Sequence, residues 1–262
     1  MSGKVTIGDL RAGRPLVAAS VLLFLLGAGA PTGARAQQYF DPGIVQKPIL
    51  RKPGALQPRG ARLGSFMFNT GALLGWTYND NVFYLPENEI GDSALGMRAN
   101  ASLNSDWNRH ALNFNGWVDT SAYLEEDLND YTDWSLRADG RVDVRQNSWF
   151  SADVTYMRLH EDRRSPQSNA AFRPTKFNYG GFGVGYDHVF NRLKVGGYFN
   201  RNSFDFEDNV TGEGEPIDNS FRNRDQDQLT LRADYQVGAE TAVFGRVGFN
   251  EISYDVSPDE NG

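Results

Sequence analysis

Histidine is the side chain best suited to acid–base or metal chemistry near neutral pH, and this sequence has only three: His110, His160 and His188. None has a neighbour at the spacing of a metal site, and no pairing with a hydroxyl nucleophile suggests itself. We therefore expect no catalytic residue, no metal and no cofactor. Because His160 is followed by Glu161 and Asp162, a hydrolase that uses His160 stays open as a minor hypothesis.

The strongest chemical pattern is a row of alternating charges in segment 134–144. Arg137, Asp139, Arg141 and Asp143 occupy every second position, and the positions between them hold apolar residues or glycine. Successive side chains of a β-strand point to opposite faces, so this segment predicts a strand with one charged face and one apolar face. Eleven residues tilted by about 45° cross the hydrocarbon core of a bilayer, which predicts a membrane-spanning strand.

The same alternation recurs along most of the chain. It appears in segments 66–78, 94–105, 112–124, 150–156, 177–188, 193–200, 228–237 and 243–249. Four connections are short (106–109, 145–148, 189–192 and 238–241), and the four between them are longer and polar (79–93, 125–132, 160–176 and 205–224). Short turns at one rim and long loops at the other are typical of outer-membrane barrels. We expect an all-β, antiparallel, up-and-down transmembrane β-barrel with about nine strands present.

Aromatic side chains gather near both ends of these strands. Trp76, Tyr78, Trp134 and Tyr156 lie toward the long loops, and Trp107, Trp149, Tyr186 and Tyr235 lie near the short turns. Two aromatic levels mark the two interfaces of a membrane. A soluble β-sandwich also alternates, with one face buried, but it needs neither two aromatic levels nor strands of such uniform length.

The charged positions of the strands are the candidate lumen lining. They are Arg98, Asp119, Asp133, Arg137, Asp139, Arg141, Asp143, Asp153, Lys194, Arg232 and Asp234. In one interpretation opposite charges pair across strands and stiffen the wall. In the other they line a water-filled pore and orient polar solutes. Both can hold, and the interleaved signs predict weak ion selectivity.

The N-terminus reads as a secretory signal over residues 1–36. A basic start is followed by the apolar run 16–30, and Ala34-Arg35-Ala36 provides a small-x-small site with cleavage after Ala36. A membrane anchor is the alternative, although the run is short for a span of roughly 20 residues. Residues 37–64 hold four prolines and five basic residues and predict an extended periplasmic linker. Residues 65–262 would form the barrel.

Composition excludes several classes of protein. The formal net charge is −7, and removing residues 1–36, which carry four Lys or Arg and one Asp, would make it −10. That balance argues against nucleic acid as a partner, because such proteins need a basic face. The mean hydropathy is −0.52, which argues against a helical membrane protein. The sequence has no cysteine, so no disulfide holds the fold.

The expected strand count is odd, and residues 260–262 read as the start of another long loop. Bacterial single-chain barrels close with even strand numbers, and an open sheet in lipid leaves backbone groups unpaired. We therefore expect the chain to be an N-terminal part of a larger barrel, incomplete at its C-terminus, or to be completed by another chain.

Segment 75–83 resembles a known family. Its run Tyr78-Asn79-Asp80-Asn81 is similar to the first-strand signature of the outer-membrane β-barrel porin 2 family, and to barrels of exopolysaccharide operons in Gram-negative bacteria. The resemblance would cover most of 65–262, and members are typically longer. It implies a barrel for polysaccharide export or passive passage, with the lipid bilayer, polysaccharide and periplasmic export components as partners. It brings no catalytic residues.

A porin-like channel of the outer membrane is thus the leading expectation for function. The runner-up is a structural or adhesive surface barrel with a blocked lumen, and the third is an outer-membrane hydrolase that uses His160. Electrical conductance across a bilayer separates the first two hypotheses.

Overall fold

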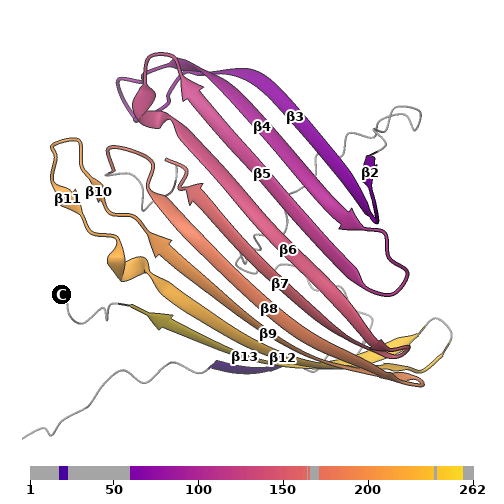
Figure 1. Ribbon diagram of the computed structural model, residues 1–262. Coiled ribbons are helices and arrows are strands. Elements are labelled where there is room, and N and C mark those ends of the chain that lie inside the picture. The colour runs from indigo at the N-terminus through magenta and orange to yellow at the C-terminus, as the bar shows by residue number, and fades with distance from the viewer. Residues whose placement is uncertain (1–17, 23–59, 164, 166–170, 239–240, 256–262) are drawn as a thin grey trace, which may run out of the picture.

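The computed structural model describes residues 18–22, 60–163, 165, 171–238 and 241–255. Nine long antiparallel strands dominate it (Figure 1), and they confirm the nine segments expected from the alternation. They are β3 (Phe66–Asn79), β4 (Asp92–Ser105), β5 (Ala111–Tyr123), β6 (Tyr131–Arg145), β7 (Ser148–His160), β8 (Lys176–Phe190), β9 (Leu193–Phe206), β12 (Arg224–Gln236) and β13 (Ala242–Tyr254).

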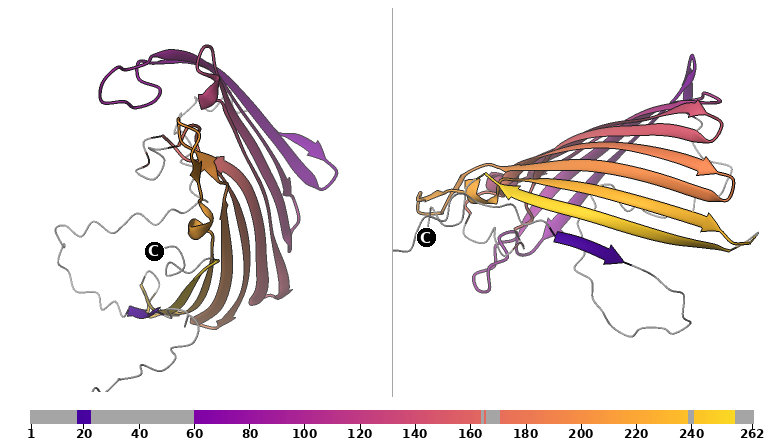
Figure 2. Two further views of the ribbon diagram at one scale, coloured as in Figure 1. Left: turned by 90° about the vertical axis from the view of Figure 1, so that its left-hand side faces the viewer. Right: turned by 90° about the horizontal axis from the view of Figure 1, so that it is seen from below.

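The strands form one sheet in which chain neighbours pair, with the order β1-β13-β12-β9-β8-β7-β6-β5-β4-β3-β2. The short strands β1 (Ala18–Leu22) and β2 (Ala61–Leu63) lie at its two edges, on β13 and β3. A small hairpin, β10 (Asn209–Val210) and β11 (Pro216–Ile217), stands apart in the loop between β9 and β12. The described sheet curves strongly, as the left view of Figure 2 shows, but its two edges do not pair with each other.

The connections alternate in length as the sequence predicts. Tight turns at 146–147 and 191–192 join β6 to β7 and β8 to β9, and Asn191 has a φ of 49°. Asparagine tolerates this left-handed conformation better than most residues, which makes it suitable for a two-residue turn. The described residues of the longer connections 80–91, 124–130, 161–175 and 207–223 lie at the opposite rim. They include two 3₁₀ turns, η1 (Asp127–Asn129) and η2 (Ser220–Arg222).

Burial on the two faces is the reverse of that in a soluble sheet. Apolar side chains are exposed, Leu74 at 76% and Leu136 at 61%, whereas the polar Ser135, Thr155 and Asp187 are each about 5% exposed or less. Side chains on the concave side of a curved sheet crowd together, so the polar face is the concave one. An apolar convex face and a polar interior are the arrangement of a barrel whose outer surface meets lipid.

The buried apolar residues lie at the long-loop end of the sheet. In the described part of the chain they are Val82, Ala94, Met157, Ala171, Tyr179 and Phe206. The long loops lean toward the concave side, as the left view of Figure 2 shows. A small core therefore forms where the loops fold over the rim of the polar face, and the middle of the sheet has no apolar core.

Two short strands fall in segments for which the sequence predicts other roles. β2 forms from residues 61–63, at the end of the predicted linker, and pairs with the start of β3. β1 lies inside the predicted signal and pairs with residues 246–250 of β13. Signal cleavage after Ala36 stays a prediction, and it would remove β1 and leave that edge of β13 free. Residues 1–17 and 23–59 of these two segments lie outside the described part.

Candidate functional site

The strand register places all eleven candidate lumen residues on one face of the sheet, because directly opposite residues in an antiparallel pair share a face. Arg98 lies opposite Asp119, which lies opposite Asp133. Farther along the sheet, Asp139 lies opposite Asp153 and Lys194 opposite Asp234. This is the polar, concave face, and we name it the inner face. That these residues line a lumen remains a prediction.

Opposite charges lie side by side on the inner face from β4 to β7. Arg98 donates to Asp119 on the next strand. Arg137 Nε lies 3.6 Å from Asp139 Oδ1, and its Nη2 lies 3.5 Å from Asp153 Oδ2. One cation is thus shared by two carboxylates that lie opposite each other.

Further ion pairs lie on the inner face of β6, β8, β9 and β12. Arg141 Nε lies 2.7 Å from Asp143 Oδ1, and Arg232 Nη2 lies 2.6 Å from Asp234 Oδ1. Lys194 Nζ lies 3.0 Å from Asp187 Oδ1, a carboxylate that the sequence analysis did not select. The alternation in the sequence could have placed Asp187 on the inner face, because it falls on the same alternate positions as Gly183 and Gly185 of β8.

Trp149 lies on the inner face, which differs from its expected place in the outer aromatic band. It sits opposite Asp143 and Asp187, with the Arg141 guanidinium 4.3 Å and the Lys194 ammonium 5.2 Å from its ring. The physical reason is strand parity. In β7 the odd positions point inward, and nearness to a turn does not decide the face.

The other predicted interface aromatics lie on the outer face or at its rims. Trp134 packs on Tyr156 with ring centroids 5.5 Å apart, and Tyr186 packs on Phe150 at 4.7 Å. Trp76, Tyr78 and Tyr235 are exposed at 65%, 59% and 47%. Trp107 lies in a short turn, with its ring 5.4 Å from Phe66. Aromatics therefore stand at both ends of the outer apolar band.

A hollow of about 610 Å³ opens on the inner face over β7, β8, β9, β12 and β13. It is lined almost entirely by polar side chains and glycine backbone: Ser151, Asp153, Gly183, Val184, Gly185, Lys194, Tyr198, Asn200, Gln228, Thr230, Arg232, Asp234 and Arg246. Four of these charged residues were predicted from the sequence. Tyr198, Asn200, Gln228 and Arg246 were not singled out, although their alternate positions in the strands are a readable signal.

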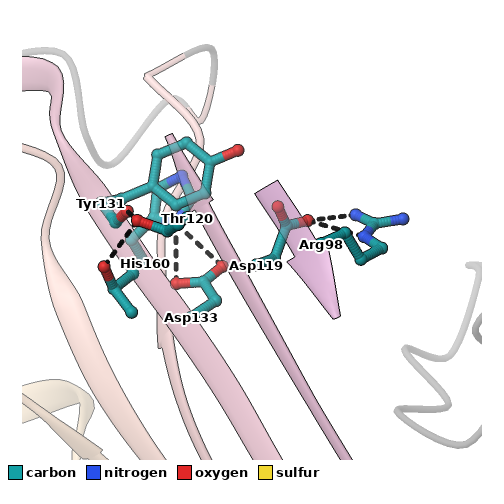
Figure 3. Close-up of polar contacts among 7 residues, drawn as sticks. Arg98, Asp119, Thr120, Tyr131, Asp133 and His160 are labelled. Atoms are coloured by element: carbon teal, nitrogen blue, oxygen red, sulfur yellow. Dashed lines mark hydrogen bonds and ion pairs between the residues drawn. The ribbon is translucent and has the colours of Figure 1, made fainter. Parts of the chain in front are cut away.

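A second polar cluster joins β5, β6 and β7 near the long-loop rim (Figure 3). His160 Nδ1 lies 2.9 Å from Asp133 Oδ1, and the ring of His160 stacks on Tyr131 with centroids 3.9 Å apart. Thr120 Oγ1 donates to the carbonyl of Tyr131 at 3.0 Å. Across the described residues, no hydroxyl hydrogen-bonds to His160. The cluster therefore has the acid and base of a catalytic triad without its nucleophile.

The long loops are tied together by buried polar contacts that the sequence did not reveal. Arg222 of η2 forms a two-pronged ion pair with Glu161, and its guanidinium lies 3.9 Å from the Phe206 ring. Arg163 donates to the side chain of Asn129 and to the carbonyl of Phe172. Loop 161–175 thus contacts the loops on both sides of it.

The described residues include neither a cluster of metal ligands nor a membrane-spanning helix. No three His, Asp or Glu side chains there come together in a group that could hold a metal ion. Among those residues, no helix is long and apolar enough to cross a membrane.

The outward apolar band, the inward paired charges and the up-and-down order of strands define an outer-membrane β-barrel of the porin class. The chain belongs to the family described as "Putative beta-barrel porin 2", which matches residues 52–262. The resemblance carried by Tyr78-Asn79-Asp80-Asn81 is thereby confirmed. No curated protein matches the chain.

Nine solved chains match this chain, among them two structures of TodX, which are distantly similar to it. One is the toluene transporter TodX of Pseudomonas putida, with a TM-score of 0.36 and 11% identity over 75% of this chain and 67% of that chain. The other is a TodX deletion mutant titled a monoaromatic hydrocarbon channel, with a TM-score of 0.34 and 11% identity over 77% of this chain and 67% of that one. At this distance, TodX indicates nothing about the solute of this chain.

Proposed function

We propose that the chain forms the wall of an outer-membrane channel for polar, hydroxylated solutes, with polysaccharide as its natural cargo. One observation carries the proposal: the inner face is strongly polar, yet most of its charged side chains lie beside a charge of the opposite sign. A channel conducts when its wall binds a solute well enough to admit it and weakly enough to release it. Paired charges and amides meet that requirement for a sugar, which forms hydrogen bonds but is not trapped by a net charge.

Neutral polar groups stand between the ion pairs. Asn113 lies opposite Asp139 and donates to it at 2.8 Å, and Asn100 and Asn115 occupy the same inner face. Such amides offer both donors and acceptors to a solute hydroxyl. Membership of a porin family supports the passage of a solute through the barrel. The lipid bilayer, and components of a periplasmic export system, are the partners that this function would require.

Conductance of the full-length protein in a planar bilayer tests the proposal. We expect open channels with a permeability ratio of K⁺ to Cl⁻ close to one, because the wall charges are paired. The substitution Arg137→Gln leaves Asp139 and Asp153 without their shared cation, so it should shift the ratio toward K⁺. The control Lys176→Gln removes the same charge from the exposed end of β8 and should leave the ratio unchanged.

Two results would overturn the proposal: correctly inserted protein that does not conduct, or a wild-type channel with a strong preference for one ion sign. Liposome swelling with oligosaccharides of increasing length then tests the cargo. Entry of short oligomers supports sugar passage, and exclusion of a disaccharide by an ion-conducting channel would refute it.

A surface barrel with a blocked lumen is the second candidate, and the loop contacts favour it. The amide of Phe172 donates to the carbonyl of Val210 at 2.7 Å, which joins loop 161–175 to the β10–β11 hairpin on the concave side of the rim. Loops joined in this way can present a binding surface to a ligand outside the cell. Absence of conductance, together with ligand binding that is lost when residues 211–214 are deleted, would establish this candidate in place of the channel.

A further inference from the structure

Arg246 is a cation without a carboxylate partner in the described part of the chain. Its Nη2 donates to Thr230 Oγ1 at 3.4 Å, and it lies directly opposite Arg232 in the register of β12 and β13. Arg232 is already neutralised by Asp234. Like charges in directly opposite positions repel each other. An anion bound next to Arg246 would therefore offset its repulsion by Arg232.

The hollow next to Arg246 exists because β8 and β9 carry glycines on the inner face. A Cβ atom at Gly183 would lie 2.6 Å from Asp153 Oδ1 and 2.8 Å from Asn200 Oδ1. A Cβ at Gly185 would lie 2.6 Å from Tyr198 Cδ1. The side chains of Asp153, Asn200 and Tyr198 therefore pack directly on the glycine backbone. Any larger residue in place of either glycine would displace them.

Tyr198 is held in place within this hollow. Its hydroxyl donates to Asp187 Oδ1 at 2.5 Å, and Asp187 is in turn paired with Lys194. A fixed aromatic ring beside a polar cavity offers an apolar surface for the C–H face of a sugar, with little loss of side-chain entropy.

Free hydrogen-bonding groups complete the lining. Among the described residues, the side chains of Ser151, Asn200 and Gln228 have no hydrogen-bond partner, and all three line the hollow. Two amides and a hydroxyl can satisfy several sugar hydroxyls at once. The volume of about 610 Å³ falls within the range of roughly 300–1,000 Å³ that small-molecule sites occupy.

We propose that this hollow is a binding subsite for an acidic sugar, a pyranose ring that carries one carboxylate. Arg246 binds the carboxylate, Tyr198 packs against the ring, and Asn200 and Gln228 bind ring hydroxyls. The subsite rests on the proposed function, since it names the solute class of the same inner face. Its open shape favours weak binding, which suits a solute that moves on along the wall.

Equilibrium binding tests the subsite without reference to conduction. The full-length protein, folded in detergent micelles, is titrated with D-glucuronate, D-glucose and acetate, and binding is followed by saturation-transfer NMR. We expect D-glucuronate to bind at least about tenfold more tightly than either of the others, because only it offers both a carboxylate for Arg246 and a ring for Tyr198. Equal affinity for D-glucuronate and D-glucose would overturn the carboxylate assignment, and equal affinity for D-glucuronate and acetate would overturn the ring assignment.

Three variants and one control locate the binding. Arg246→Gln should reduce the affinity for D-glucuronate to that for D-glucose, and Arg246→Lys should keep part of the preference. Asn200→Ala, which adds no bulk, should weaken both sugars. Lys176→Gln removes a cation outside the hollow and should change neither, and an equal loss in that control would refute the site.

The two proposals fail in different ways. A conducting channel that shows no saturable D-glucuronate binding at tens of millimolar, a concentration at which a weak subsite would be occupied, overturns the subsite alone. Binding to the hollow by a protein that does not conduct overturns the channel and keeps the subsite.

Discussion

Nδ1 of His160 lies 2.9 Å from Oδ1 of Asp133, and this pair joins β6 to β7 beneath the long loops. The carboxylate fixes the orientation of the imidazole, while the ring of Tyr131 covers one face of it. This is the only arrangement in the described residues that approaches the geometry of a hydrolase, and it lacks a nucleophile. We expect it to have a structural role at the rim.

His160→Ala therefore should not change the function of the protein. Purified wild-type protein and the variant should show the same absence of p-nitrophenyl ester hydrolysis and the same conductance. The third hypothesis, a hydrolase, would be restored by an esterase activity that the wild type has and the variant loses.

The face assignment of β6 predicts opposite results at neighbouring positions. Ala138 lies on the outer face and Asp139 on the inner face. Ala138→Arg places a charge in lipid, at a cost of about 2–4 kcal/mol near the bilayer midplane, and should block assembly. Asp139→Ala should leave assembly intact and alter ion passage. Heat-modifiable migration on SDS gels measures the folded fraction, and equal folding of both variants would contradict the assignment.

Buried and exposed ion pairs of the long loops should differ in their contribution to loop stability. The side chains of Arg222 and Glu161 are 9% and 12% exposed, whereas those of Arg158 and Glu207 are 39% and 42% exposed. Arg222→Ala leaves a buried carboxylate without its cation and should lower the free energy of loop opening by about 3–5 kcal/mol. Arg158→Ala should cost about 1 kcal/mol or less. Hydrogen exchange of amides in loop 207–223 measures both values, and equal effects would refute the distinction.

The order of loop 207–223 should depend on pH through Asp218. The hydroxyl of Ser220 and then its backbone amide, which donates to Asp218 Oδ1 at 2.8 Å, lower the pKa of Asp218 below its ordinary value of 3.8. A carboxyl group with a lowered pKa stabilises the folded loop above the ordinary value and loses this effect as the pH falls through the lowered one.

We therefore expect faster proteolysis of loop 207–223 at pH 3 than at pH 6, measured with an acid-active protease and normalised to an unstructured peptide. Asp218→Asn keeps an acceptor oxygen and cannot titrate, so its cleavage should lose part of the pH dependence. A variant with the same pH dependence as the wild type would show that Asp218 does not contribute.

The predicted signal gives a test at the N-terminus. Protein recovered from the outer membrane of an expressing Gram-negative host should begin at Gln37, because cleavage follows Ala36. N-terminal sequencing measures this directly. A mature chain that begins at Met1 would instead agree with β1 remaining paired to β13.

Much of the fold could be read from the sequence, since the side-chain alternation of a strand has a period of two and is local. The nine long strands, the alternation of short and long connections and the common face of the eleven charged residues all follow from it. Trp149 shows that nearness to a turn does not predict the face on which an aromatic side chain lies. Its position near a turn suggested the outer face, whereas its odd position in β7 places it on the inner face. The alternation of odd and even positions predicted the face correctly.

Only the tertiary structure determined which charged side chains form ion pairs and where the inner face has a hollow. Arg222 and Glu161 are 61 residues apart, and no local pattern predicts a contact that depends on how two loops fold over one rim. The hollow likewise depends on side chains from five strands settling over Gly183 and Gly185. Alternation determines the direction in which a side chain points, but the register between strands and the curvature of the sheet determine what it contacts.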